Sequence, residues 1–287
     1  MIEERLFDLY LLEDTFPADV TSAIIPENKI VVAKMISKSK GIVAGIKVIK
    51  HLLERKGLSV ELHKNDGEEI TPGDTILTIR GPARLVLTLE RTVLNIVMRM
   101  SGIATQTRML VEMVHKINPA VRIAATRKTT PGFRYFEKMA VEIGGGDTHR
   151  FNLADMVLIK DNHIKILGGI ENALSVAKSS VSFSKKVEIE VRTKEEAITA
   201  AKCGADIIML DNFSPEQIRE TLAELKRLDL RNHVIIEASG GITPQNIEEY
   251  AKTGVDVISL GYLTHSVKSL DISLKIIKVE ECESKIH

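Results

Sequence analysis

From about residue 120 onward, short runs of β-branched and aliphatic residues alternate with amphipathic stretches. Strands that alternate with helices predict βαβ units and a parallel sheet. These runs are apolar on both faces, which predicts a sheet that is covered by helices or closed into a barrel. The six runs are 121–127, 156–161, 187–192, 206–211, 234–239 and 256–261.

Three of the intervening stretches carry the start signal of a helix. Residues 193–204, 214–228 and 243–254 each open with a Ser or Thr that suits an N-cap. The first and third also close on a glycine, which suits a C-cap. We therefore expect helices at these positions, between the strands.

Residues 1 to about 118 show a different pattern, typical of an α+β domain. Its expected elements are a strand and turn at 30–41, a helix at 44–57, strands within 59–70 and 74–81, and a helical pattern at 84–117 that breaks at Ser101-Gly102. The chain as a whole is thus predicted to be α/β. A domain over 1–118 precedes a β/α barrel domain over 119–265.

Composition and charge disfavour several classes of partner. The chain has 39 basic and 39 acidic residues, and a net charge of zero argues against nucleic acid or an anionic membrane surface. Its two cysteines, Cys203 and Cys282, do not make a disulfide framework, which favours a cytoplasmic setting. The opening MIEERLFDLY lacks a signal-peptide pattern. We expect no membrane span, because no apolar run reaches roughly 18–20 residues.

Functional side chains gather where the six apolar runs end. They are Arg127, Lys128, Lys160, Asp161, Glu190, Asp211, Ser239 and Gly261. A β/α barrel forms its active site at the carboxyl ends of all its strands, whereas a doubly wound sheet uses only its switch point. Contributions from all six ends favour a closed or nearly closed barrel.

Cationic residues between 126 and 165 predict a pocket for a small, highly charged anion. Arg127 and Lys128 end one run, and Lys160 ends the next. Between them His149 and Arg150 follow three glycines, whose backbone can approach a ligand closely. Arginine suits carboxylate or phosphate, and lysine acts as a mobile point charge. The alternative for the first two is a solvated basic pair.

Lysine and carboxylates at the strand ends leave more than one interpretation open. Lys160 could be a Schiff-base nucleophile, an anion binder or the partner of a barrel carboxylate. Glu188 and Glu190 face the same side of their strand and need cations, for which Lys128 and Lys160 are the candidates. Glu190 and Asp211 could bind sugar hydroxyls or, through water, Mg²⁺. The alternative for these three carboxylates is an interior layer of ion pairs. Separately, His163 is expected to support its loop.

Glycine loops follow the last two apolar runs. Ser239 and Gly240 begin one loop, and Gly261 precedes His265 in the other. Loops of this kind that enter helices commonly bind phosphate through backbone N–H groups. These loops therefore predict a phosphorylated ligand.

Taken together, these motifs resemble the quinolinate phosphoribosyltransferase family, also called nicotinate-nucleotide pyrophosphorylase. The resemblance extends to the first half of the chain and covers nearly all of it. Its motifs are TRKTTPG, GGGDTHR, LIKDNHI, EIEV, MLDN, EASGGI and LGYLTHS, preceded by LLEDTFPADVTS, GIVAGI, DGEEITPGD and LERTVLNIVMRMSGIATQT.

The resemblance implies both an architecture and a reaction. It implies an N-terminal α/β sandwich, joined by the C-terminal segment 266–287, and an open, irregular β/α barrel of about six or seven parallel strands. It also implies a homodimer or higher homo-oligomer with shared active sites. The implied reaction joins quinolinate to phosphoribosyl pyrophosphate with Mg²⁺ and gives nicotinate mononucleotide, pyrophosphate and CO₂, in NAD biosynthesis.

The resemblance also implies a role for each site residue. Arg91 would reach into the neighbouring subunit's site. Quinolinate would be bound by Arg127, His149 and Arg150, and the site near the pyrophosphate would be lined by Thr126, Lys128 and Lys160. The ribose and Mg²⁺ would be contacted by Glu190 and Asp211. The 5′-phosphate would be bound by Ser239, Gly240, Gly261 and His265.

The chain departs from the family pattern at two positions. Thr148 stands where the family usually has Asn, and Ala18 stands where it has Gly. Neither change removes a cationic contact. The rival interpretations are a paralogue associated with molybdate uptake, a nicotinate phosphoribosyltransferase, a sugar-phosphate binding protein and an aldolase that uses Lys160.

Overall fold

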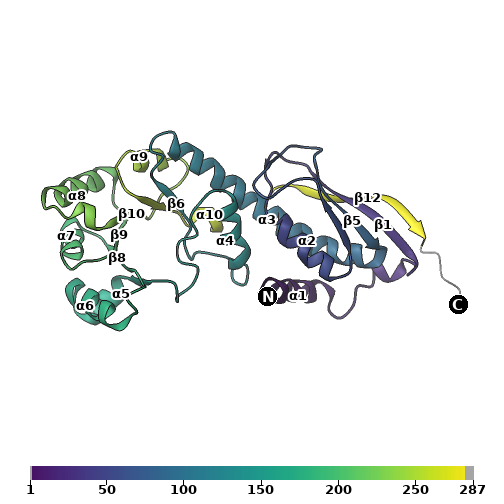
Figure 1. Cartoon of the computed structure of the whole chain (residues 1–287), viewed down its shortest axis with the longest axis horizontal. Helices are drawn as coiled ribbons and strands as arrows, with labels where there is room; N and C mark the ends of the chain where they lie inside the picture. The colour runs from purple at the N-terminus through teal and green to yellow at the C-terminus, as the bar shows by residue number, and fades with distance from the viewer. Residues whose placement is uncertain (1, 282–287) are drawn as a thin grey trace. The chain divides into compact units, whose positions relative to one another are not determined.

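The computed structural model describes residues 2–281 and divides into two compact units (Figure 1). The first unit comprises the residues up to Arg108, Thr130–Gly145 and the segment from Val267 onward. The second comprises Met109–Thr129 and Gly146–Ser266. Residues 282–287, including Cys282, lie outside the described residues. The sequence-based domain boundaries stay a prediction about which parts of the chain fold independently.

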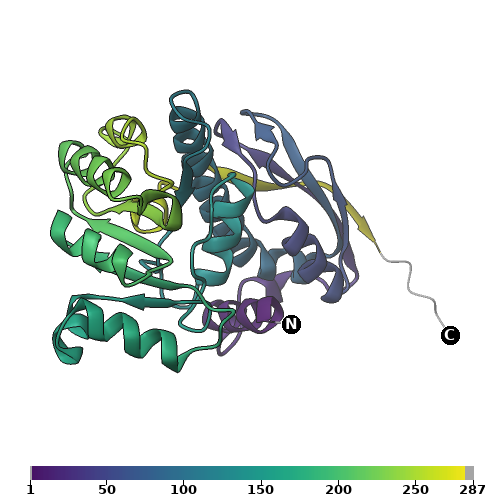
Figure 2. The same cartoon turned by 60° about the vertical axis from the view of Figure 1, so that its left-hand side comes forward.

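An antiparallel sheet of order β12-β1-β5-β3 forms the first unit's framework. Burial alternates along β1, where Val31, Ala33 and Met35 face the core, as expected for a sheet covered on one face. The last strand, β12, pairs with β1 along its length and runs beside it in Figure 2. The elements of this unit are α1 (Ile2–Thr15), β1 (Lys29–Ser37), β2 (Gly41–Ile42), α2 (Ile46–Arg55), β3 (Ser59–Leu62), β4 (Glu69–Ile70), β5 (Thr75–Pro82), α4 (Arg134–Ile143) and β12 (Ile272–Glu281).

The helix break predicted at Ser101-Gly102 is wrong, because α3 runs without interruption over Ala83–His115. The Ser101 hydroxyl accepts a hydrogen bond from the Ala44 N–H at 3.0 Å. A Cβ on Gly102 would lie 2.3 Å from the Lys268 carbonyl oxygen. These two small residues therefore allow close packing against the helix, and tertiary contacts outweigh the low helix propensity of glycine.

Six parallel strands make the sheet of the second unit, in the order β6-β11-β10-β9-β8-β7. Because β6 and β7 are edge strands, the barrel is open, as predicted. In Figure 1 the helices α7 and α8 lie outside β8 and β9. The elements are β6 (Arg122–Ala124), β7 (Val157–Ile159), α5 (Asp161–Leu167), α6 (Ile170–Ser180), β8 (Val187–Val191), α7 (Lys194–Lys202), β9 (Ile207–Asp211), α8 (Pro215–Arg227), β10 (Ile235–Ser239), α9 (Ile247–Ala251), β11 (Val257–Ser259) and α10 (Tyr262–His265).

Two of the three predicted N-caps are confirmed. Thr193 caps α7 and Ser214 caps α8, each by accepting a backbone N–H three residues later. The third is wrong, because α9 begins only at Ile247. There the Asn246 side chain accepts the Thr243 N–H at 2.8 Å, so a turn replaces the first part of the predicted helix.

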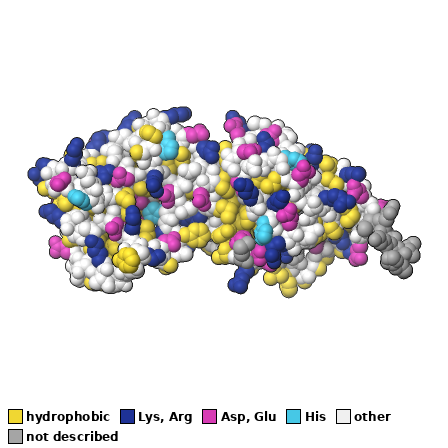
Figure 3. Space-filling view, viewed as in Figure 1, with side chains coloured by type: hydrophobic (Ala, Val, Ile, Leu, Met, Phe, Trp, Pro, Cys, Tyr) yellow, Lys and Arg dark blue, Asp and Glu magenta, His cyan; other side chains and the backbone are white. Residues whose placement is uncertain are grey.

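The surface carries both signs of charge. Lys and Arg side chains are interspersed with Asp and Glu side chains on the face drawn in Figure 3, in keeping with the net charge of zero. No helix among residues 2–281 is long and apolar enough to cross a membrane.

Candidate active site

A cavity of about 310 Å³ lies at the carboxyl ends of the strands in the second unit. Its lining includes ten residues that the sequence predicted for the site. These are Thr126, Arg127, Lys128, His149, Arg150, Lys160, Glu190, Asp211, Ser239 and Gly240. Arg91 is exposed on α3 in the first unit and is not part of this lining.

Strand register explains why residues distant in the sequence meet at this cavity. Asp211 on β9 lies opposite Ser239 on β10, and Ser239 lies opposite Ser259 on β11. The two serine hydroxyls are 2.9 Å apart. Because parallel strands end at the same edge of a sheet, the polar residue that ends each run reaches the same cavity.

Two arginines form the cationic side of the cavity. The Arg127 Nε is buried and has no hydrogen-bond partner among the described residues. Arg150 is only 9% exposed, and burial and then repulsion from Arg127 lower its pKa. A buried guanidinium nitrogen without a hydrogen-bond acceptor is costly, so this pair suits an anionic ligand.

Carboxylates occupy another part of the lining. The Lys160 Nζ donates to the Glu190 Oε2 at 2.6 Å, and the Arg192 Nε lies 3.8 Å from the Asp211 Oδ2. The start of α5 is held by His163, whose Nδ1 accepts the Lys160 backbone N–H at 3.0 Å. The predicted loop at His163 is therefore a helix, and His163 supports the N-terminus of that helix.

Gly261 allows two of the predicted site residues to approach each other. A Cβ at Gly261 would lie 2.8 Å from the Lys128 Cδ and 2.9 Å from the His265 Cδ2. The Thr264 hydroxyl also donates to the Lys128 carbonyl at 2.7 Å. The loop after β11 is thus packed against Lys128, a residue of the cavity lining.

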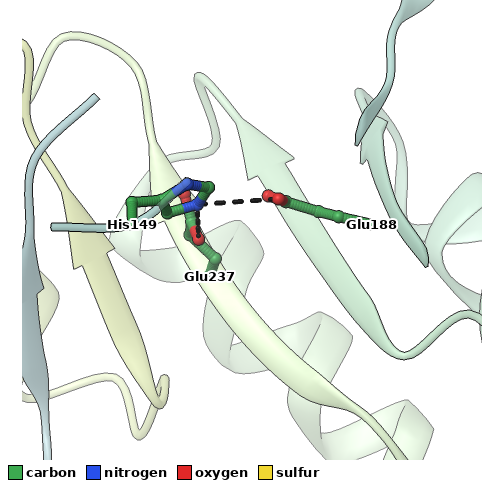
Figure 4. Close-up of side chains that lie close together, drawn as sticks. All are labelled: His149, Glu188 and Glu237. Carbon is green, nitrogen blue, oxygen red and sulfur yellow. Dashed lines mark hydrogen bonds and ion pairs between the residues drawn. The ribbon is translucent and has the colours of Figure 1, made fainter. Parts of the chain in front are cut away.

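Glu237, which was not among the predicted site residues, contacts His149 (Figure 4). The His149 Nε2 lies 3.0 Å from the Glu237 Oε2 and 3.6 Å from the Glu188 Oε2. Both glutamates are essentially buried. Glu237 is a charged residue two positions before Ser239 in an apolar strand, so the period of two could have revealed it. Glu188 does take part in an interior ion pair, with a histidine rather than with Lys128 or Lys160.

The two nitrogens of the His149 ring have different partners. Nδ1 accepts the Arg150 backbone N–H at 2.8 Å, so the proton is on Nε2, which faces the carboxylates. Burial lowers the pKa of His149, but the neighbouring carboxylates of Glu188 and Glu237 outweigh burial and raise the pKa to about 10. The Arg150 N–H opposes this rise, because protonation of Nδ1 would remove its acceptor.

Two groups of side chains have donors suited to a metal ion. Glu190 and Asp211 offer carboxylates at the cavity, which suit Mg²⁺ together with water and phosphate oxygens. In the buried group, one ligand atom from each of His149, Glu188 and Glu237 lies within 4.8 Å of the others. There the His149 Nε2 faces both carboxylates and pairs with the Glu237 Oε2 at 3.0 Å.

The fold and cavity define an α/β protein with an open barrel and a site for a small anion. Residues 19–101 and 103–275 match the N-terminal and C-terminal domains of quinolinate phosphoribosyl transferase. The chain therefore belongs to the quinolinate phosphoribosyltransferase family.

Individual relatives agree with this assignment. The probable nicotinate-nucleotide pyrophosphorylase (carboxylating) of Archaeoglobus fulgidus is 53% identical over 260 residues, which cover 91% of this chain and 98% of that one. The protein of the same name from Methanothermobacter thermautotrophicus is 52% identical over 256 residues, covering 89% and 92%. The structure of NadC from Streptococcus pyogenes has a TM-score of 0.87 at 37% identity, covering 96% and 95%. Human nicotinic acid phosphoribosyltransferase, at 13% identity and a TM-score of 0.65, shares the fold alone.

Proposed function

We propose that the chain transfers the phosphoribosyl group of phosphoribosyl pyrophosphate to quinolinate and releases pyrophosphate and CO₂. The product, nicotinate mononucleotide, serves NAD synthesis. The observation that carries this proposal is the arginine pair, a buried Arg150 and an Arg127 whose Nε is buried, which shares one cavity with Glu190 and Asp211. Guanidinium groups suit the two carboxylates of quinolinate, and carboxylates suit the ribose of the donor.

The proposed roles follow from where each group lies in the lining. Arg127 and Arg150, with His149, bind quinolinate. Lys128 and Lys160 lie between quinolinate and the leaving pyrophosphate, with Thr126 at the end of β6. Ser239 and Gly240, with Gly261 and His265 of the adjacent loop, bind the 5′-phosphate.

Glu190 and Asp211 have two proposed tasks. They bind the ribose hydroxyls, and they hold Mg²⁺ through its water ligands. The ion would supply positive charge for the pyrophosphate. As pyrophosphate departs, the ribose carbon gains positive charge, which preorganised carboxylates stabilise. The Lys160–Glu190 contact of 2.6 Å holds this carboxylate in place before substrate binds.

Decarboxylation follows bond formation and needs little from the protein. The C2–carboxylate bond breaks, CO₂ leaves, and the electron pair stays at the carbon beside the pyridinium nitrogen, whose positive charge stabilises it. A proton then replaces the carboxylate. The protein's part is to orient the reactants and neutralise their charge. An ammonium held against Glu190 is a poor nucleophile, which disfavours an aldolase mechanism at Lys160.

The experiment that tests this function is an initial-rate assay with phosphoribosyl pyrophosphate, Mg²⁺ and either quinolinate or nicotinate. We expect nicotinate mononucleotide from quinolinate only. Turnover of nicotinate alone would instead assign the chain to the nicotinate phosphoribosyltransferases. As a check on the aldolase alternative, borohydride with a carbonyl substrate should trap no adduct on Lys160.

We further propose a homodimer or higher homo-oligomer with shared sites. Exposed apolar side chains near the start of the chain are consistent with an interface, among them Leu12, Phe16 and Val20, which are 57%, 78% and 76% exposed. Arg91 is exposed and free to reach a neighbouring subunit. A cytoplasmic location stays a prediction.

Mixing two inactive variants tests the shared site. Arg91→Ala and Arg127→Ala should each fold and lose activity, because each removes a carboxylate-binding group. In a mixed dimer one site would receive both native arginines, so part of the activity should return. The control mixes each variant with itself. Absence of recovery, once hybrid dimers are detected by mass spectrometry, would contradict the shared site.

A further inference from the structure

The strands that line the cavity carry a second, deeper set of charged residues. Glu188 lies two residues before Glu190 on β8, and Glu237 lies two residues before Ser239 on β10. Side chains two positions apart point to the same face of a strand. Glu190 and Ser239 therefore stand one layer above a pair of buried carboxylates.

These deeper carboxylates have few partners of their own. Both oxygens of Glu188 and the Oε1 of Glu237 are buried without a hydrogen-bond partner among residues 2–281. The Glu237 Oε2 accepts a hydrogen bond from the His149 Nε2 at 3.0 Å, and the Glu188 Oε2 forms an ion pair with the same nitrogen at 3.6 Å. Figure 4 shows the imidazole ring with this nitrogen turned toward both carboxylates. Burying a carboxylate costs desolvation free energy. The presence of two buried carboxylates here therefore indicates a role other than packing.

The backbone around His149 is also unusual. Its φ of 52° lies in the left-handed region, which costs a non-glycine residue about 1 kcal/mol or more. Asp147 accepts the His149 N–H at 2.7 Å, and the ring's Nδ1 accepts the Arg150 N–H at 2.8 Å. A ring anchored at Nε2 therefore fixes the conformation of the segment 147–150 through Nδ1.

The segment also separates two cavities. His149, Arg150 and Glu237 line both the substrate cavity and a second cavity of about 650 Å³. The second one is bordered by the first residues of strands, such as Ile207 and Ile235. Without an anchor the segment 147–150 could shift toward either cavity, and Arg150 would shift with it.

We propose that Glu237 and Glu188 are positioning residues, which hold the His149 ring from behind and thereby set the place of Arg150 in the quinolinate site. The proposal rests on the proposed function above. Glu237, at the shorter distance, contributes more than Glu188. Glu188 is not part of the cavity lining, and the carboxylate of Glu237 is turned to His149, so we expect their removal to act on quinolinate through His149 and Arg150.

The test compares Glu237→Leu, Glu237→Gln and Glu188→Gln with the wild type in steady-state kinetics. Glu237→Leu should raise the KM for quinolinate by roughly tenfold to a hundredfold, the loss expected for a hydrogen bond to a charged group. The KM for phosphoribosyl pyrophosphate should stay unchanged. Glu237→Gln keeps the shape of the side chain and a hydrogen-bond acceptor, so its quinolinate KM should rise less than that of Glu237→Leu. It also provides the test if the leucine variant fails to fold. Glu188→Gln should have a smaller effect.

A double-variant cycle separates positioning from general damage. Adding Glu237→Leu to His149→Ala should cause no further rise in the quinolinate KM, because the ring that Glu237 holds is already gone. The proposal would be overturned if the fold-increases in the quinolinate KM of the two single variants multiplied in the double variant. It would also be overturned if Glu237→Leu left the quinolinate KM unchanged. Glu224→Gln is the control, since it changes another second-unit carboxylate, paired with Arg227 at 2.6 Å outside both cavities, and should leave the quinolinate KM unchanged.

A spectroscopic measurement keeps this proposal separate from the function on which it rests. In wild-type protein labelled with ¹⁵N-histidine, the His149 ring should show a proton on Nε2, and Glu237→Leu should change that signal. If the wild type does not turn over quinolinate, the function fails, and this signal alone decides the positioning role. An unchanged signal in Glu237→Leu would refute the positioning role. The role would also be refuted if the wild type bound one metal ion per chain and Glu237→Leu lost that ion.

Discussion

Two ion pairs of the same length, one in each unit, differ in what surrounds them. In the first unit Arg99 lies 2.6 Å from Glu137, whose side chain is 0% exposed. In the second unit Lys160 lies 2.6 Å from Glu190, and the lysine side chain is 46% exposed. Distance alone does not distinguish them, so their roles have to be found in their other contacts.

The remaining contacts assign the two pairs to different tasks. Glu137 also accepts the Thr130 backbone N–H at 3.1 Å and the Thr130 hydroxyl at 2.9 Å, so its carboxylate holds the turn that begins there. Glu190 lines the cavity with Lys160, where a substrate can reach both. The first pair is therefore structural, and the second is available to a ligand.

Arg99→Met should have the largest effect, and it should fall on stability. The substitution keeps the length of the side chain but leaves Glu137 buried without its ion-pair partner. We expect a loss of about 3 kcal/mol in the free energy of unfolding, measured by denaturant titration. Activity per folded molecule should change little, and a stable but inactive variant would break the assignment of this pair.

Lys160→Met is the matched substitution in the second unit, and its effect should fall on rate. We expect kcat/KM to drop by about 10²–10³-fold, as for the loss of one charge-stabilising group. Because the lysine is half exposed, the free energy of unfolding should change by less than about 1 kcal/mol. If unfolding shifts as much as in Arg99→Met, the contrast between the two pairs is wrong.

Asp19 offers a smaller test, through acid stability in the first unit. Hydrogen bonds from Ser22 and then from Thr88 lower the pKa of Asp19 to about 2, from an ordinary value near 3.8. A lowered pKa stabilises the folded state above pH 3.8, and this contribution is lost as pH falls through 2. In Asp19→Asn the unfolding free energy should depend less on pH between 4 and 2. An identical slope in both proteins would contradict the assignment.

The sequence predicted much of the fold and most of the residues that line the cavity, because both follow from local sequence patterns. Strands that end at or directly before Lys160, Asp211 and Ser239 could be found from apolar runs, and a parallel sheet brings such ends to one edge. The open six-stranded barrel is confirmed. The chemical roles of these residues stay predictions, which the experiments above address.

Two features that the sequence did not predict depend on contacts between distant segments, and a third depends on one local hydrogen bond. Gly102 is compatible with a continuous helix only because backbone at Lys268 packs against it. The pairing of His149 with Glu237 joins residues 88 positions apart. The short helix at Ile247 follows from a side-chain hydrogen bond within its own turn. None of these contacts leaves a periodic signal in the sequence.

The most direct test of the central claim is a single-turnover experiment with quinolinate labelled by ¹³C in its C2 carboxylate. We predict one labelled CO₂ for each nicotinate mononucleotide formed, and none when phosphoribosyl pyrophosphate is left out. Lys160→Met should slow both products equally, whereas Arg99→Met should slow neither in the folded fraction. Release of labelled CO₂ without the donor, or nucleotide that keeps the label, would contradict the account.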